Sequence, residues 1–160
     1  MVGADGKADV SPRGDVPGFI RIIDERTIAI PDRPGNRRAD TMSNILANPN
    51  GSVGLIFLVP GVEEVMRASG RAIVSSDPTL LGEMAVNGKV PKLAVVITLD
   101  EVFFHCGKAL KRAGLWNPDK QMNRRNFPSY AELIHKQRRP DEPLEKIENF
   151  IADNYKNELY

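Results

Sequence analysis

Residues 93–104, with the sequence LAVVITLDEVFF, decide the fold class. Valine, isoleucine, threonine and phenylalanine favour the pleated, half-buried environment of a β-strand, so this stretch predicts one long strand. Residues 53–59 (VGLIFLV) and 64–74 (EVMRASGRAIV) have the same character and are separated by a proline–glycine turn. Gly70, inside the second of these stretches, predicts a bulge or a close approach of two backbones.

Shorter strands and turns precede this region. Asp5-Gly6 is a hairpin dipeptide that predicts a strand at residues 8–11, and the apolar residues 19–23 and 27–30 predict two more strands. Six or seven strands with short turns predict a mainly β, antiparallel barrel or sandwich of the Greek-key type. Alternating strand–helix units are absent from the sequence, which argues against a doubly wound nucleotide-binding fold.

Four segments predict helices. They are residues 38–48, a segment that begins at Asp77-Pro78, residues 107–115 and residues 143–155. Each has apolar residues at helical spacing. Asp77 is expected to cap its helix with its carboxylate, and Pro78 to occupy the first helical position.

The composition is that of one globular domain. The chain has 160 residues, with 22 Lys and Arg against 21 Asp and Glu, and a formal net charge of +1. This balance argues against nucleic-acid binding through bulk charge. The apolar runs are too short to cross a bilayer, and the amino terminus lacks a signal-peptide core. Because the single cysteine, Cys106, fits a reducing compartment, we expect a soluble cytoplasmic protein with no membrane partner.

Several catalytic motifs are excluded by spacing. His105 and Cys106 are adjacent, and adjacent side chains on a strand point to opposite faces, so they cannot form a nucleophile–base pair. One cysteine and two histidines are too few for a zinc site. Cys106 is interpreted as a small buried hydrophobe, and His105 as a polar residue at a strand end. Since no self-contained catalytic motif remains, we expect a cofactor to carry any chemistry.

Residues 32–38 (DRPGNRR) form the first of two basic clusters, directly before a predicted short helix. Arginine can hold phosphate oxygens in bidentate geometry, and a helix amino terminus adds oriented N–H groups. Arg37 and Arg38 are therefore candidate phosphate ligands, and Arg13 could join them if the fold brings the two loops together. The alternative is that Arg37 and Arg38 are solvated charges, although helix starts prefer acidic residues.

Residues 103–116 contain the second basic cluster. Lys108, Arg112 and either Leu115 or Trp116 are spaced to share one face of a helix. Two cations and an indole on one face could cover a flat, electron-rich ring. The alternative is that Trp116 caps the core while both cations extend to water.

Residues 8–15 (ADVSPRGD), 30–38 (IPDRPGNRR), 44–49 (NILANP), 70–72 (GRA) and 104–110 (FHCGKAL) follow one another along the chain. Taken together, in this order, they resemble the flavin-nucleotide-binding relatives of pyridoxamine 5'-phosphate oxidase. The resemblance covers residues 6–118 and does not include the carboxy-terminal tail.

The resemblance implies a split β-barrel that forms a homodimer and binds FMN noncovalently at the dimer interface. In this family a basic pair before the short helix holds the FMN phosphate, a role that falls on Arg37 and Arg38, with Asn36 beside them. The family's contacts that line the flavin fall on Val10, Ser11 and Arg13. Its contacts to the flavin ring or ribityl chain fall on Pro31 and Asp32. Its carboxy-terminal contacts near the flavin fall on Lys108, Arg112 and Trp116.

The chain departs from the family in two places. Family members carry a further helix and strand before the point where this sequence begins, so the barrel is expected to lack both. The substrate-binding residues of the oxidase are not recognisable here, which argues against activity on pyridoxamine phosphate. We therefore expect an FMN-dependent oxidoreductase for another small redox substrate, with an FMN-binding domain at residues 1–118 and a basic, partly helical extension at residues 119–160.

Other functions are compatible with the same motifs. The chain could be a flavin-binding or sensing module without turnover, which the absent substrate motif favours. The same barrel could hold a deazaflavin or haem, and His105 would matter for haem. A nucleic-acid role for the basic stretch after His105 ranks last, because few aromatic residues interleave with its charges.

We predict that replacing both Arg37 and Arg38 with alanine gives a folded but colourless protein, because the FMN phosphate loses its bidentate donors. Circular dichroism checks the fold, and visible absorption measures the flavin that the purified protein retains. A double variant as yellow as the wild type would exclude the phosphate role of these two arginines.

Overall fold

The computed structural model of the protein describes residues 1–3, 5–35, 39–48 and 50–159. The chain forms two compact units, Met1–Trp116 and Asn117–Tyr160. The first unit contains all the strands of the sheet, and the second contains short 3-10 turns and two helices. Among the described residues, we find no helix of the length and apolar character that crossing a membrane requires.

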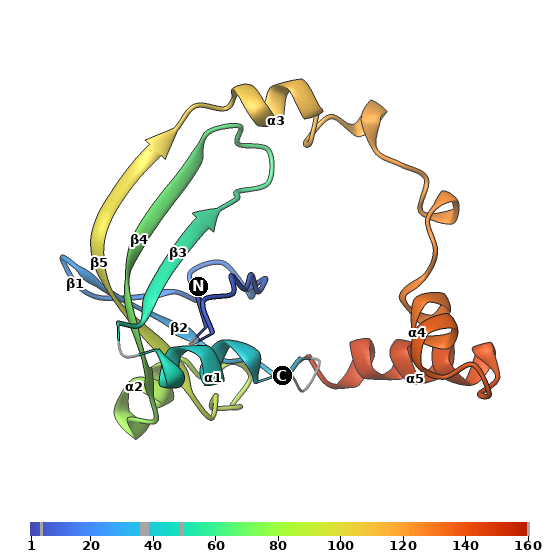
Figure 1. The fold of residues 1–160 in the computed structure, drawn as a ribbon, viewed down its shortest axis with the longest axis horizontal. Helices are drawn as coiled ribbons and strands as arrows, with labels where there is room; N and C mark the ends of the chain where they lie inside the picture. The colour runs from blue at the N-terminus through green and yellow to red at the C-terminus, as the bar shows by residue number, and fades with distance from the viewer. Residues whose placement is uncertain (4, 36–38, 49, 160) are drawn as a thin grey trace. The chain divides into compact units, whose positions relative to one another are not determined.

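A single antiparallel sheet dominates the first unit (Figure 1). Its strands are β1 (Arg21–Asp24), β2 (Thr27–Pro31), β3 (Ser52–Phe57), β4 (Val65–Ser75) and β5 (Ala94–His105), in the spatial order β1-β2-β5-β4-β3. β4 and β5 are long and curved, and they pair along their whole lengths (Figure 1). The predicted architecture, mainly antiparallel β with short helices, is confirmed.

A bulge interrupts the pairing of β4 with β5 at Gly70. The register shifts between Ser69 and Gly70, and Asp100 is the extra residue on β5. A Cβ atom at position 70 would lie 2.1 Å from the carbonyl oxygen of Thr98, so only glycine allows this approach. The prediction of a bulge or close backbone approach at Gly70 is confirmed.

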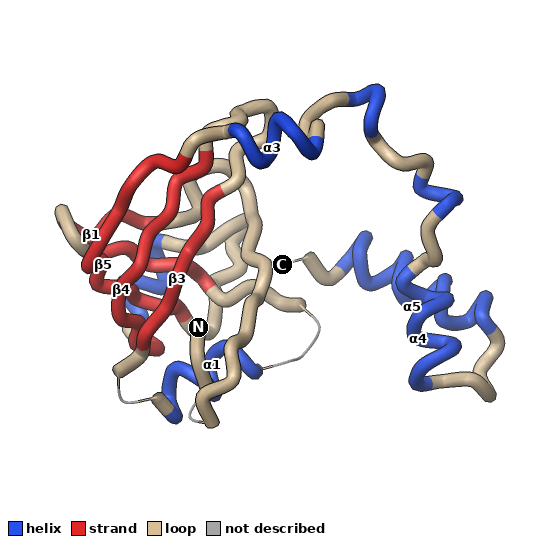
Figure 2. Tube along the Cα trace, turned by 45° about the horizontal axis from the view of Figure 1, so that its top comes forward, coloured by secondary structure: helices blue, strands red, loops and turns tan. Residues whose placement is uncertain are grey.

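The larger part of the core lies on one face of the sheet, where α1 (Asp40–Ala47) packs. Figure 2 shows α1 and α3 (Lys108–Ala113) at opposite ends of the sheet. The helix contributes Met42 and Ile45 to this cluster. The buried strand residues that complete it are Ile28, Ile30, Val53, Ala72, Val95 and Ile97.

The other face carries a smaller core under α2 (Pro78–Glu83). The buried members of this cluster are Ala29, Leu81, Met84 and Ala94. Asp77 caps the helix by accepting hydrogen bonds from the N–H groups of Thr79 and Leu80, and Pro78 occupies the first turn. Both predictions for the start of this helix are confirmed.

The predicted strand at residues 8–11 is wrong. Within it only Ala8 pairs, in an isolated bridge to Val2, and Val10 is 91% exposed. Pro12 has no backbone N–H to donate, and the loop that follows contains further prolines and glycines, so no ladder extends from the bridge.

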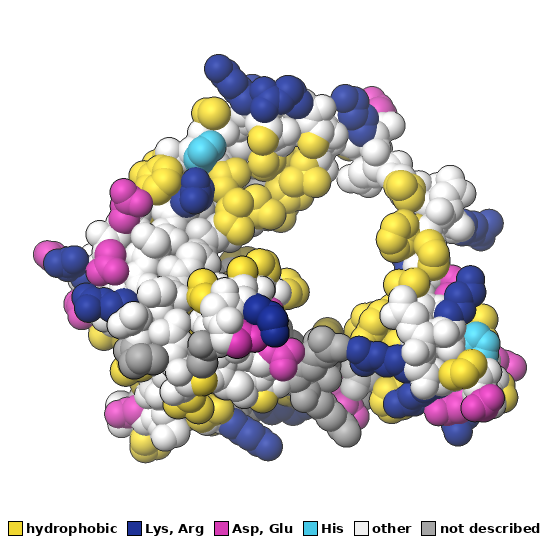
Figure 3. Space-filling model, in the orientation of Figure 1, with side chains coloured by type: hydrophobic (Ala, Val, Ile, Leu, Met, Phe, Trp, Pro, Cys, Tyr) yellow, Lys and Arg dark blue, Asp and Glu magenta, His cyan; other side chains and the backbone are white. Residues whose placement is uncertain are grey.

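α3 follows the end of β5 at the surface of the first unit. Figure 3 shows Lys and Arg side chains along the outer side of this helix and apolar side chains gathered on its other side. The helix ends at Gly114, whose φ of 61° lies in the left-handed region.

Two helices, α4 (Tyr130–Arg138) and α5 (Leu144–Asn157), make up most of the second unit, after the 3-10 turns η1 (Pro118–Lys120) and η2 (Arg124–Asn126). They bury Ala131 and Ile147. The sequence predicts α5 but misses α4, although Ser129 and Glu132 form a capping box at its start. The backbone N–H of Ser129 donates to Glu132 and lowers the pKa of that carboxyl.

We predict that Ile97→Ala lowers the free energy of unfolding by about 2–5 kcal/mol, because a side chain that is 1% exposed leaves a cavity. Urea unfolding followed by circular dichroism measures the loss. The matched control is Ile73→Ala on the neighbouring strand, which is 64% exposed and should lose less than about 1 kcal/mol. Equal losses would contradict the assignment of the core face.

Candidate functional site

Two loops and the last residue of β2, all near the start of β5, carry five of the predicted site residues. We call these residues the loop cluster: Val10, Ser11, Arg13, Pro31 and Asp32. Pro31 is buried and pairs with Ala94, the first residue of β5. The backbone N–H of Asp32 then donates to the carbonyl oxygen of Leu93 at 2.9 Å. The loop that begins at Asp32 therefore leaves the sheet from a fixed position. Val10 and Ser11 lie on the other loop, before β1, and are exposed.

Arg13 and Asp32 join the two loops. Nη1 of Arg13 donates to Oδ1 of Asp32 at 2.7 Å, across 19 residues of sequence. Their side chains are 28% and 35% exposed, so the pair remains accessible to solvent. The fold thus brings together two segments that the sequence analysis assigns separately to one site. An ion pair this exposed contributes at most about 1 kcal/mol to stability.

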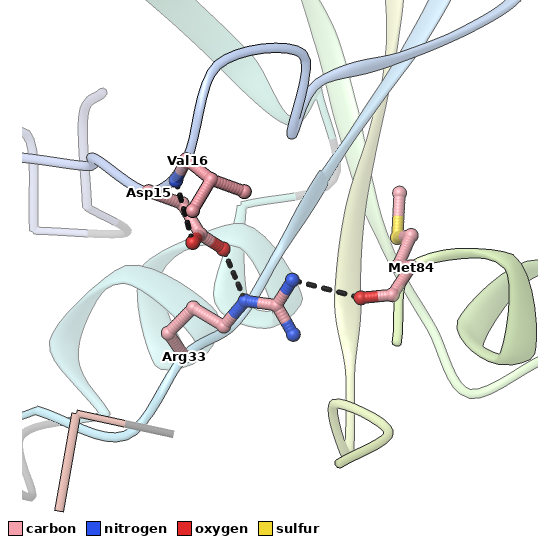
Figure 4. A network of polar contacts seen from close by, with 4 residues as sticks. All are labelled: Asp15, Val16, Arg33 and Met84. Atoms are coloured by element: carbon pink, nitrogen blue, oxygen red, sulfur yellow. Dashed lines mark hydrogen bonds and ion pairs between the residues drawn. The ribbon is translucent and has the colours of Figure 1, made fainter. Parts of the chain in front are cut away.

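A second ion pair joins the same loops and is buried (Figure 4). Nε of Arg33 donates to Oδ2 of Asp15, and the two side chains are 12% and 1% exposed. Nη2 of Arg33 also donates to the carbonyl oxygen of Met84 at the end of α2, at 2.7 Å. The backbone N–H of Val16 donates to Oδ1 of Asp15 at 2.7 Å. Arg33 therefore connects its own loop both to the first loop and to the end of α2.

The sequence analysis does not single out Asp15 and Arg33. The sequence did contain a signal for these pairs. The first loop has a cation followed by an anion, Arg13 and Asp15, and the second has an anion followed by a cation, Asp32 and Arg33. Complementary charges in two loops do not by themselves show that the loops meet. Only the fold supplies that information.

The predicted phosphate ligands Asn36, Arg37 and Arg38 lie outside the residues that the structure describes. The chain on both sides of them is described. Arg33 is held by Asp15 and by α2, and α1 begins at Asp40. The phosphate role of the three residues stays a prediction.

The second basic cluster lies at the other end of β5. We call Lys108, Arg112 and Trp116 the α3 cluster. Lys108 and Arg112 are exposed on α3, but Trp116 follows Gly114, where the helix has already ended. The prediction that Leu115 or Trp116 shares a helical face with both cations is wrong, because the left-handed glycine terminates the helix first.

Trp116 contacts the turn between β3 and β4. Its indole Nε1 donates to the carbonyl oxygen of Val62 at 2.8 Å. Lys111 on α3 forms an ion pair with Glu63 in the same turn at 2.7 Å. These contacts hold α3 against the turn and give Trp116 a structural partner. A contact of Trp116 with a cofactor stays a prediction.

The loop cluster and the α3 cluster are separated by the length of β5. That strand has 12 residues, which is about 40 Å along the strand at about 3.3 Å per residue. Asp32 is bonded beside its first residue, and Lys108 follows its last. The two clusters therefore lie at opposite ends of β5.

His105 and Cys106 are both exposed. The ring of His105 lies 6.5 Å from that of Phe103, and the Arg67 guanidinium lies 5.3 Å from the Phe103 centroid. The interpretation of Cys106 as a buried hydrophobe is wrong, because β5 ends at His105 and Cys106 lies on the surface before α3. Among the described residues, no group of three His, Cys, Asp or Glu side chains could hold a metal ion.

Comparison with known proteins agrees with the fold. The family model described as pyridoxamine 5'-phosphate oxidase matches residues 2–106. The crystal structure of HupZ from Group A Streptococcus superimposes with a TM-score of 0.50 and 20% identity, covering 64% of this chain and 78% of its own. The structure of a histidine-to-alanine variant of HupZ superimposes with a TM-score of 0.49 and 19% identity, covering 65% of this chain and 84% of its own. No curated protein matches the chain. At this identity the HupZ likeness shows the fold alone, the predicted split β-barrel.

We predict that Asp15→Asn lowers the free energy of unfolding by about 3–5 kcal/mol, because it removes the carboxylate charge that faces the guanidinium of Arg33, whose side chain is only 12% exposed. Urea unfolding measures the change. Arg21→Met breaks the exposed Arg21–Glu83 pair, whose side chains are 48% and 51% exposed, and should lose less than about 1 kcal/mol. A loss for Asp15→Asn as small as that of this control would contradict the assigned role of the buried pair.

Proposed function

The chain belongs to the pyridoxamine 5'-phosphate oxidase family, and we propose that it binds FMN noncovalently at the loop cluster and acts as an FMN-dependent oxidoreductase. The observation that carries the proposal is the 2.7 Å ion pair between Arg13 and Asp32. It joins two segments that the family resemblance assigns to the flavin independently. FMN, when bound, supplies a ring that accepts and returns electrons or hydride.

The described residues of the loop cluster fit the polar groups of FMN. Its ribityl chain and ring edge offer hydroxyl, carbonyl and N–H groups. Arg13 has further N–H donors besides the one given to Asp32, and the Asp32 carboxylate has further acceptor sites. Ser11 adds an exposed hydroxyl that can donate or accept. In this proposal these side chains bind the flavin and orient its ring.

In this proposal Arg37 and Arg38 bind the phosphate of FMN, with Asn36 beside them. These residues lie directly before α1, which has eight residues and begins at Asp40. The positive end of the helix dipole adds to the attraction for an anion there. Support for this part of the proposal comes from the sequence motif.

A second copy of the chain completes the site in this proposal. The loop cluster and the α3 cluster lie at opposite ends of β5, a path of about 40 Å along the strand, and in this proposal the two clusters that contact one flavin come from the two chains of a homodimer. The half of β5 next to α3 also exposes apolar surface, with Val102 50% and Phe104 78% exposed. Burial of such a surface favours association.

A flavin-binding or sensing role without turnover is the second candidate. It is favoured by the absence of recognisable substrate-binding residues of the oxidase from this sequence. In either role, the single cysteine fits a reducing compartment such as the cytoplasm.

The proposal is tested by adding FMN to the purified chain and then NADH or NADPH without oxygen. We expect quenching of flavin fluorescence on binding, and bleaching of the oxidised flavin faster than with free FMN. Quenching without faster bleaching would favour the sensing role. If the chain purifies without flavin and leaves the fluorescence of added FMN unchanged, FMN binding is excluded.

A further inference from the structure

The second unit, Asn117–Tyr160, exposes apolar side chains that its two helices do not cover, and we propose that it associates with the second unit of another copy of the chain. In this proposal α4 and α5 of two copies form a four-helix bundle. The basic half of one copy (residues 117–139) faces the acidic half of the other (residues 140–160). The contact involves no residue of the proposed FMN site, so the proposal goes beyond that function and does not rest on it.

The core of the second unit is small. α4 has 9 residues, α5 has 14, and the buried apolar side chains of the unit are Ala131 and Ile147. Isolated helices shorter than about 12–15 residues are marginal in water, and units below about 70 residues rarely gain enough stability from one core. Association is one route by which small units become stable. Burial of further apolar surface would therefore stabilise this unit.

Apolar side chains suited to such burial are exposed on both halves of the unit. On α5, Phe150 and Tyr155 are each 60% exposed. By helical spacing they lie on the two sides of the stripe that Ile147 buries. The other large apolar side chains exposed on the described part of the unit are Met122, Phe127, Tyr130 and Leu159. Burial of these side chains in a contact between chains favours association.

The charges of the unit are divided between its two halves. The basic half has six Lys or Arg residues and two Asp or Glu residues, whereas the acidic half has two and six. The halves therefore carry formal charges of +4 and −4, which cancel. An ion pair between them, Arg139–Glu142 at 3.6 Å, lies in the connection between the two helices.

This division of charge favours a second copy as the partner. A partner with one sign of charge would be attracted to one half of the unit and repelled by the other. A second copy carries both signs. In a two-fold arrangement the basic half of each chain faces the acidic half of the other, so the same favourable contact forms twice.

The acidic side chains of α5 lie beside its exposed aromatic side chains. Asp153 follows Phe150 by three residues, and Glu148 precedes Tyr155 by seven, so each pair lies on one side of the helix. All four side chains are exposed. In helical bundles, charges that flank an apolar face determine which helices pair and in which orientation.

The test reverses exposed charges of one half at a time in the full chain. One variant combines Lys136→Glu with Arg138→Glu on α4, and the other combines Glu148→Lys with Asp153→Lys on α5. Hydrogen exchange followed by mass spectrometry measures the protection of the α4 and α5 amides. We expect each variant alone to lose at least about tenfold in protection, because like charges then face each other between chains.

The two variants are then unfolded together in urea and refolded as an equal mixture. We expect the protection of α4 and α5 to rise above that of either variant alone, because the reversed α4 of one chain faces the reversed α5 of the other. The matched control combines Arg21→Glu with Arg26→Glu, two exposed residues of the first unit, and should leave this protection unchanged. The amides of β4 and β5 show whether the first unit remains folded in every sample.

Three results would overturn the proposal. Variants as well protected as the wild type would show that these charges do not hold the helices in place. Protection that stays low in the mixture would show that the charges act within one chain. Unprotected α4 and α5 amides in the wild type would show that the apolar surface stays open in solution. None of these results depends on whether the chain binds FMN.

Discussion

The antiparallel pairing of β4 with β5 is the interaction on which the rest of the first unit depends. These strands pair from Val65 opposite His105 to Ser75 opposite Ala94, with one bulge at Gly70. Their backbone groups satisfy one another, and they offer two faces on which α1 and α2 bury apolar side chains. β2 and β3 attach to the outer edges of this pair. The ends of β5 consequently set where each candidate cluster lies, the loop cluster at its start and the α3 cluster beyond its end.

Charge complementarity then orders the loop cluster. Two ion pairs cross between the loops, Arg13–Asp32 and Asp15–Arg33, and they differ in their surroundings. Asp15 and Arg33 are shielded from water, where either charge alone would be strongly unfavourable, so they hold the loops together. Arg13 and Asp32 remain open to solvent and keep unused donors and acceptors for a ligand. The same two loops are therefore joined by one pair that is shielded from water and one that is accessible to it.

Local signals predict most of the fold, and contacts distant in sequence account for the rest. Residues 93–104 predict β5 because β-branched residues favour a strand on their own. The hairpin signal before residues 8–11 is also local. A strand, however, needs a hydrogen-bonded partner along its length, and the neighbouring proline and glycine residues prevent such pairing. The capping box of α4 is a local signal that the sequence analysis overlooks. The ion pairs Arg13–Asp32 and Asp15–Arg33 form only because the fold brings two loops together. No local sequence pattern predicts that these loops are close in space.

The central claim is that this chain holds FMN, and the most direct measurement is the visible absorption spectrum of the purified full chain, with the released chromophore identified by mass spectrometry. The account predicts an oxidised-flavin spectrum and release of FMN. A colourless protein that also fails to take up added FMN would contradict it, as would the release of a different chromophore.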